Sequence, residues 1–100
     1  GHYLAGGRIN GQPVVFLLDT GATDVAVPEA LADRLGLQRR YRSVSRTANG
    51  NITTWSTRLD SVDLGGIRRH NVRASILPNM TGDEVLLGMS FLKHIFQGVR

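Results

Sequence analysis

The feature that most constrains this chain of 100 residues is a series of strand-forming segments broken at short intervals by turn residues. Residues 3–9 and 12–18 flank Asn10 and Gly11, a dipeptide that tolerates positive φ angles and favours the type I′ turn of a hairpin. Turn signals return about every eight to twelve residues, a spacing typical of all-β folds. The pattern predicts about seven short strands in a barrel-like domain.

Three further patterns, one of them within the second strand, indicate how the strands are placed. Residues 14–18 are apolar without interruption, which predicts a strand buried on both faces in the middle of the fold. Residues 43–59 are polar and β-branched around a second Asn-Gly pair, so we expect a long hairpin that projects from the body. Residues 60–64 and 67–77 predict another hairpin, with a Gly-Gly bend between them.

Two short helices are expected among these strands. Pro28 suits a first helical turn, Glu29 complements the positive end of the helix, and Gly36 suits its end. Residues 89–96 form a second amphipathic segment. We expect the first helix to bury a narrow apolar side made of Ala30, Leu31 and Leu35.

Composition narrows the function classes. The formal net charge is +4, but the arginines are scattered, with local pairs at residues 39–40 and 68–69 and without the aromatic interleaving that a single-strand binder uses. Nucleic-acid binding is therefore not expected. Cysteine is absent, and the three histidines (His2, His70 and His94) lie far apart and match no metal-ligand spacing, so neither a metal nor a cofactor is expected.

The triplet Asp19, Thr20 and Gly21 is the candidate chemical site. A three-residue match is weak by itself, but Asp19 directly follows an apolar strand. An acid at the end of a buried strand is costly unless its surroundings provide partners. Ala22 then extends the run of small residues, where another chain can approach closely.

Three features together resemble the retropepsins, and in particular their bacterial single-domain relatives with an Asp-Thr-Gly-Ala motif. The first is an N-terminal hairpin that leads into Asp19 through Ala22. The second is the glycine-containing hairpin around Asn49, in the position of a flap. The third is the sequence Leu-Leu-Gly at residues 86–88, before a closing helix.

The resemblance covers nearly the whole chain, so residues 1–100 are expected to form one retropepsin-like domain. It implies a closed, antiparallel β barrel with one or two short helices that works as a homodimer. Each subunit supplies one Asp19, and the two carboxyl groups form the catalytic dyad of an aspartic endopeptidase. The implied partners are a second copy of the chain and a protein or peptide substrate.

The same resemblance implies roles for neighbouring residues. Thr20 and Gly21 support the active site, and Gly21 offers its carbonyl to the substrate backbone. The substrate-binding residues implied are Ala22, Thr23 and Asp24 in the cleft wall and Ala48, Asn49 and Gly50 at the flap tip. Trp55 lies either on substrate or on the body of the barrel.

Two departures from the retroviral pattern keep a second hypothesis open. Retroviral enzymes carry an acid at the position of Thr23 and an arginine at that of Met89, and these form an ion pair. The absence of both residues leaves the retroviral dimer contacts in question. The alternative is a catalytically weak or inactive dimer that binds peptides. Bacterial relatives also imply an N-terminal inner-membrane anchor outside this chain, with the domain in the periplasm.

Overall fold

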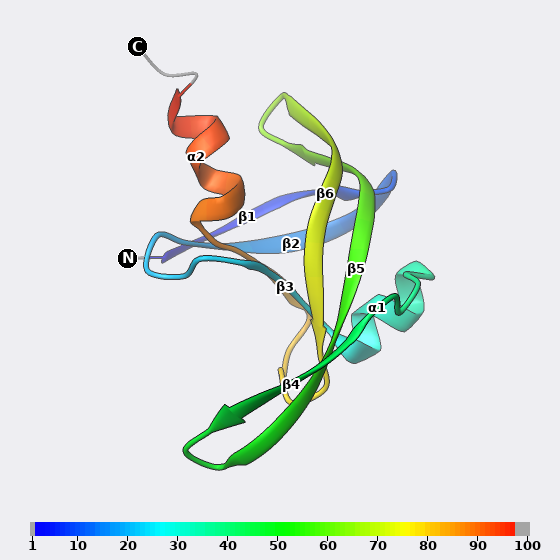
Figure 1. The fold of residues 1–100 in the computed structure, drawn as a ribbon. Helices are drawn as coiled ribbons and strands as arrows, with labels where there is room; N and C mark the ends of the chain where they lie inside the picture. Colours follow the sequence, from blue (N-terminus) through cyan, green and yellow to red (C-terminus); the bar gives the residue numbers. More distant parts are fainter. Residues whose placement is uncertain (1, 98–100) are drawn as a thin grey trace.

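The structure is a computed structural model that describes residues 2–97 (Figure 1), so Gly1 and residues 98–100 lie outside it. Within the described part, seven strands and two helices follow one another: β1 (His2–Ile9), β2 (Gln12–Asp19), β3 (Val25–Pro28), α1 (Glu29–Leu35), β4 (Arg42–Thr47), β5 (Gly50–Leu64), β6 (Ile67–Leu77), β7 (Glu84–Leu87) and α2 (Met89–Gln97).

Six of the strands close into a barrel. The sheet order is β1-β2-β7-β3-β6-β5-β4, and an additional pairing of β1 with β5 closes the ring and leaves β4 outside it. Between the described strands, β2–β7 and β3–β6 are parallel, and the other pairings are antiparallel. The predicted all-β barrel with two short helices is confirmed.

The first hairpin forms as predicted. Asn10 and Gly11 have φ angles of 51° and 79°, as a type I′ turn requires, and Ile9 pairs with Gln12 across the turn. The Asn10 N–H donates to the carbonyl of Ser61 (3.0 Å), and the Asn10 side chain accepts from the Ser61 N–H (3.0 Å). The turn therefore also connects the hairpin to β5, beside the pairing that closes the barrel.

The prediction that residues 14–18 are buried on both faces is wrong. Val14 and Phe16 are in the core, but 44% of the Val15 side chain is exposed and Leu17 is only half-buried. Alternate residues of a strand point to opposite faces, and a closed barrel offers one interior face to each strand. The outer face of β2 is apolar, and the described residues cover it only in part.

The first helix follows the predicted signals. Pro28 is its N-cap, and Gly36 ends it with a φ of 71°. The predicted buried side is only partly right. Ala30 is exposed, and the buried residues are Leu31, Ala32 and Leu35. Residues i, i+1 and i+4 share a helix face, whereas Ala30 lies one position outside that face.

The projecting hairpin is also confirmed, with a shifted boundary. The pairing of β4 with β5 covers residues 42–55 rather than 43–59, and β5 then continues into the barrel as far as Leu64. Figure 1 shows this hairpin (green) reaching away from the body. None of the helices in the described part is long and apolar enough to cross a membrane.

Candidate active site

Asp19 is the last residue of β2 and is half-buried. Its carboxylate Oδ1 accepts a hydrogen bond from the Gly21 N–H (2.9 Å), and its carbonyl accepts one from the Ala22 N–H (3.2 Å). A backbone N–H that donates to a carboxylate orients that group and stabilises its charge. The turn after β2 therefore fixes the direction in which the acid points.

The loop of residues 19–24, called the Asp19 loop below, is fixed by the start of α2. The N–H groups of Met89, Ser90 and Gly88 donate to the carbonyls of residues 22, 23 and 24, at 2.8, 2.8 and 3.0 Å. The first N–H groups of a helix have no acceptor within the helix. Here these donors are satisfied by the carbonyls of the loop, so the loop and the helix position each other.

Gly88 permits this contact. A Cβ atom at Gly88 would lie 2.6 Å from the Asp24 oxygen, 2.6 Å from the Thr23 carbonyl carbon and 2.8 Å from that of Ala22. The reason is topological, because β7 lies between β2 and β3 in the sheet and the Asp19 loop connects β2 to β3 across the end of β7. The Leu-Leu-Gly motif thus combines the end of strand β7 with a residue that has no Cβ, at the point where the Asp19 loop passes over it.

Thr23 and Met89, where a retroviral ion pair was found missing, take different roles here. The backbone of each residue takes part in the loop–helix hydrogen bonds. Met89 also packs its partly buried side chain against the core. Backbone hydrogen bonds thus join the Asp19 loop to the start of α2 at the positions of the missing charges.

The tip of the β4–β5 hairpin differs from the first hairpin. Thr47 pairs with Gly50, so Ala48 and Asn49 are the turn residues, and of residues 48–50 only Gly50 has a positive φ (108°). Thr47 Oγ1 donates to the Gly50 carbonyl (2.7 Å) and accepts from the Asn49 N–H (3.2 Å). All three tip residues are exposed.

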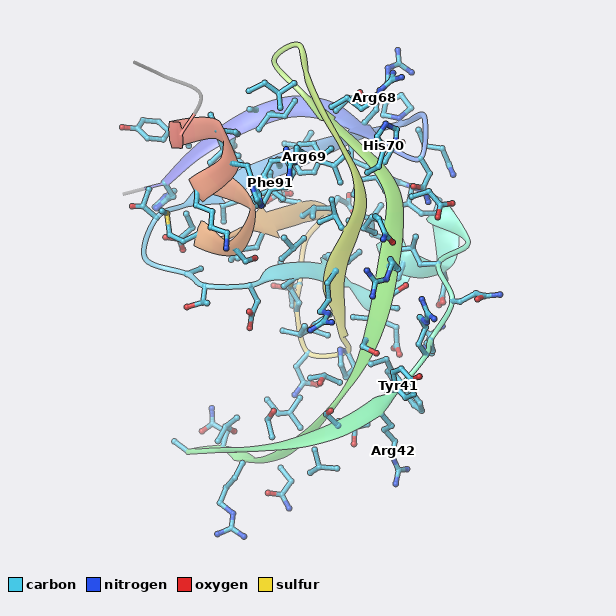
Figure 2. The ribbon with its side chains drawn as sticks, turned by 45° about the horizontal axis from the view of Figure 1, so that its top comes forward. Tyr41, Arg42, Arg68, Arg69, His70 and Phe91 are labelled. Atoms are coloured by element: carbon cyan, nitrogen blue, oxygen red, sulfur yellow. The ribbon has the colours of Figure 1, made fainter. Side chains whose placement is uncertain are left out.

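The structure brings some of the predicted site residues together and leaves others apart. Asp19, Gly21 and residues 22–24 form one loop, in which residues 20, 21, 23 and 24 are exposed. Figures 1 and 2 show the β4–β5 hairpin and the Asp19 loop on the same side of the barrel, with the hairpin tip at a distance from the loop. Trp55 is partly buried and packs against the core, which favours the body of the barrel as its contact.

Asp19 shares its face of the sheet with apolar side chains, a feature that the sequence did not reveal. Leu17 is two residues before Asp19 and pairs with Leu86 on β7 and with Leu4 on β1. Leu4 is 65% exposed, and Leu17 and Leu86 are half-buried. The Asp19 carboxylate therefore lies at the end of a partly open apolar strip. Among the described side chains, no three histidines or acids are grouped to hold a metal ion.

Comparison with known proteins agrees with this geometry. Residues 5–94 match the family model described as gag-polyprotein putative aspartyl protease. A retropepsin-like aspartic protease from Rickettsia conorii has 32% sequence identity and a TM-score of 0.77, over 93% of this chain and 78% of the other. The chain belongs to the retropepsin-like aspartic proteases.

Two more comparisons define the extent of this family likeness. The EIAV protease complexed with the inhibitor HBY-793 has a TM-score of 0.77 at 24% identity, over 96% of this chain and 89% of that one, and supports the retropepsin fold alone. Uncharacterised proteins of a Sinorhizobium species and of Rickettsia prowazekii are 32% and 34% identical, over 92% and 100% of this chain. This retropepsin-like chain spans 41% and 43% of their lengths.

Proposed function

We propose that two copies of this chain form a homodimeric aspartic endopeptidase, with one Asp19 from each copy at the two-fold axis. The observation that carries the proposal is the hydrogen-bonded Asp19 turn, held against α2, in a chain of the retropepsin-like family. These 100 residues contain a single Asp-Thr-Gly triplet, so a dyad built from this domain alone needs a second copy of it.

The chemistry follows from the distance between the two acids. Carboxyl groups about 3 Å apart share one proton, because like charges so close cannot both ionise. The ionised Asp19 accepts a proton from a bound water, which attacks the peptide carbonyl, while the protonated Asp19 donates to the carbonyl oxygen. The resulting diol collapses when the leaving amine is protonated. No metal or cofactor takes part in these steps.

Substrate would bind in an extended conformation. Leu17 and Leu86 give the face beside Asp19 an apolar surface, which suits alternate side chains of a bound strand. The backbone of residues 21–24 would contact the peptide from the barrel side. The tip of the β4–β5 hairpin, Ala48, Asn49 and Gly50, would close over the peptide as a flap.

The test is cleavage of an unfolded-protein or peptide library by the purified chain, with and without a transition-state mimic of the pepstatin type. Asp19→Asn should lower turnover by a factor of about 10² to 10⁴, the usual contribution of acid–base catalysis. Asp83→Asn, the same change in an exposed loop, is the matched control and should leave turnover unchanged. Melting temperature and sizing should match the parent for both variants.

Dilution tests the dimer in the same assay, because turnover per chain should fall below the dimer dissociation constant. Constant turnover down to concentrations at which sizing detects only monomer would exclude a dyad built from two subunits. Activity of Asp19→Asn within tenfold of the parent, about 1.4 kcal/mol in the barrier, would exclude Asp19 as the acid. Binding of peptides and of the mimic without cleavage would favour the inactive peptide-binding dimer.

A further inference from the structure

The arginines of this basic chain differ in how their charges are balanced. Arg39 pairs with Asp33 (2.9 Å) and Glu29 (3.2 Å), and these hydrogen bonds raise the pKa of its guanidinium. Arg68 pairs with Asp63, which raises its pKa in the same way. In the part of the chain that the structure describes, three other arginines have no ion-pair partner and lie around one cavity: Arg40, Arg58 and Arg73.

Two of these arginines face each other directly. Arg58 on β5 pairs with Arg73 on β6 in the strand register. The preceding residue Thr57 and its partner Ala74 are buried, so the two guanidinium groups belong to the outer face of the sheet. Like charges directly opposite on neighbouring strands repel each other and destabilise the pair. A bound anion would relieve that repulsion.

The cavity beside this pair has a volume of about 400 Å³ and no acidic residue in its lining, which consists of Arg40, Tyr41, Ser56, Thr57, Arg58 and Arg73. With a water taking about 30 Å³, this volume holds a small anion and several waters. A second cavity of about 450 Å³ shares Arg40, Thr57 and Arg58, and its lining includes one acid, Asp60.

Thr57 borders both cavities. Its side chain is 3% exposed, and among the described side chains its Oγ1 is a buried polar atom without a hydrogen-bond partner. Buried hydroxyl groups are usually paired with protein or with an ordered molecule. The strand alternation that places Arg58 and Arg73 on the outer face places the Thr57 side chain on the inner face, so its hydroxyl is not a ligand for an anion held between the arginines.

We propose that Arg40, Arg58 and Arg73 form a binding site for a small phosphate-class oxyanion at the base of the β4–β5 hairpin. A guanidinium group presents a rigid fork of N–H donors that matches phosphate oxygens. A phosphate has enough acceptor oxygens to engage several forks together, whereas a single carboxylate satisfies one. Three arginines without carboxylates therefore fit a phosphate-class ligand best.

The position of Arg40 gives the site a consequence for the hairpin. The Arg40 N–H donates to the Ser56 carbonyl (2.8 Å), the Ser56 N–H donates to the Tyr41 carbonyl (2.8 Å), and β4 begins at the next residue, Arg42. Figure 2 shows Tyr41 and Arg42 where the hairpin leaves the barrel. An anion between Arg40 and the Arg58–Arg73 pair adds a bridge there and reduces the motion of the hairpin.

Calorimetry on the full chain carrying Asp19→Asn tests the site, because binding is then measured without proteolysis. At constant ionic strength, inorganic phosphate or pyrophosphate should bind saturably with one site per chain. Arg58→Gln and Arg73→Gln should each weaken binding at least tenfold. Arg34→Gln removes the same charge from α1, outside both cavities, and should change affinity less than twofold. Absence of saturable binding, or equal losses in all three variants, would overturn the site.

Thermal melting distinguishes loss of the site from loss of the fold. Without phosphate, Arg58→Gln should melt at or above the parent temperature, because the like-charge pair is gone. Phosphate should raise the melting temperature of the parent and not of the variant. If Arg58→Gln melts at a lower temperature than the parent, and phosphate still raises the melting temperature of the variant, the proposal is contradicted.

Two further measurements identify the class of ligand and test whether its binding affects the β4–β5 hairpin. A single-stranded oligonucleotide is tested for binding in competition with phosphate and pyrophosphate. If the oligonucleotide binds and neither small anion competes with it, the ligand is nucleic acid and the proposal is overturned. Competition by either small anion supports it. Amide exchange in residues 42–55 should slow with phosphate in the parent only, and unchanged exchange would overturn the link to the hairpin.

Discussion

The Asp19 loop and the β4–β5 hairpin lie on the same side of the barrel and are held in different ways (Figure 1). The loop is held by three backbone hydrogen bonds, two from the first residues of α2 and one from Gly88, and by the close approach of Gly88. The hairpin has its own ladder of strand pairs, and residues 41–51 are exposed throughout. The loop is therefore part of the folded body, whereas the hairpin is attached to it mainly through β5.

This difference matches what a closing active site needs. An acid must stay fixed to within a fraction of an ångström, and a cover must move to admit a chain. Segments with few buried contacts and exposed backbone hydrogen bonds open at low free-energy cost, whereas core strands open only with global unfolding. Substitutions that displace the backbone contacts between the loop and α2 should therefore change stability, and substitutions in the hairpin should change turnover.

The largest expected effect on stability comes from Gly88→Ala. The new Cβ would lie 2.6 Å from backbone atoms of the Asp19 loop, and backbone cannot rotate away as a side chain does. Overpacking of this kind costs about 1–3 kcal/mol, and we expect about 3 kcal/mol because the loop–helix hydrogen bonds are displaced too. Turnover should fall with the fold. Denaturant unfolding and cleavage kinetics measure both.

Gly6→Ala is the matched control for Gly88→Ala. Gly6 lies on β1, has no positive φ, and a Cβ there would meet nothing within 4 Å. The same methyl group should leave stability unchanged or raise it by about 0.4–1 kcal/mol, since alanine lowers the entropy of the unfolded chain. Equal stabilities for the two variants would show that the Asp19 loop is not tightly held.

Local signals in the sequence predicted the local structure. Asn10 and Gly11 form their turn, Gly36 ends its helix, and Asp19 ends its strand, because each depends on the φ angles or chemistry of a few neighbouring residues. The Leu-Leu-Gly motif was recognised from resemblance, and the structure supplies its physical reason at Gly88.

Features that depend on strand pairing could not be read from the sequence. Val15 is exposed because the closure of β1 on β5 decides which face of β2 is inside. Arg58 and Arg73 are 15 residues apart, and only the register of β5 and β6 makes them neighbours. In the β4–β5 hairpin Thr47 pairs with Gly50, so the turn residues are Ala48 and Asn49, a register that the Asn-Gly pattern does not determine.

A smaller effect on stability, with a large effect on turnover, is expected for Gly50→Val. Gly50 has a φ of 108°, a conformation that a β-branched residue strongly disfavours. The exposed hairpin can relieve the strain by local fraying, so we expect a global loss below about 1 kcal/mol. Turnover should fall at least tenfold, because the tip no longer closes over the peptide. Cleavage kinetics and thermal unfolding, measured together, test this.

Gly11→Val provides the control for Gly50→Val. Gly11 has a φ of 79° with open space around it, but its hairpin belongs to the closed barrel. Strain at Gly11 should therefore cost about 1–3 kcal/mol of stability and leave the turnover of folded protein intact. If Gly50→Val instead collapsed the melting transition while its folded fraction cleaved normally, the β4–β5 hairpin would be a structural element and not a flap.

The smallest effect on stability is expected for Thr47→Val, which tests most directly whether the β4–β5 hairpin differs from the Asp19 loop. The change keeps the shape of the side chain and removes the hydroxyl that bonds Gly50 and Asn49 across the tip. Both bonds are exposed to water, so the free energy of unfolding should change by no more than about 0.5 kcal/mol. Amide exchange at residues 48–51 should become faster. KM should rise with little change in kcat, because a looser tip lowers the population that is ready to bind.

Thr81→Val makes the same substitution in the exposed loop before β7 and should change neither exchange at the tip nor KM. If Thr47→Val destabilises the chain by more than about 1 kcal/mol, the net value of a typical hydrogen bond, the tip is coupled to the body. The β4–β5 hairpin would then resemble the Asp19 loop, and the separation of a fixed acid from a movable cover would fail. A faster-exchanging tip with unchanged stability and a higher KM would instead assign the hairpin to substrate binding alone.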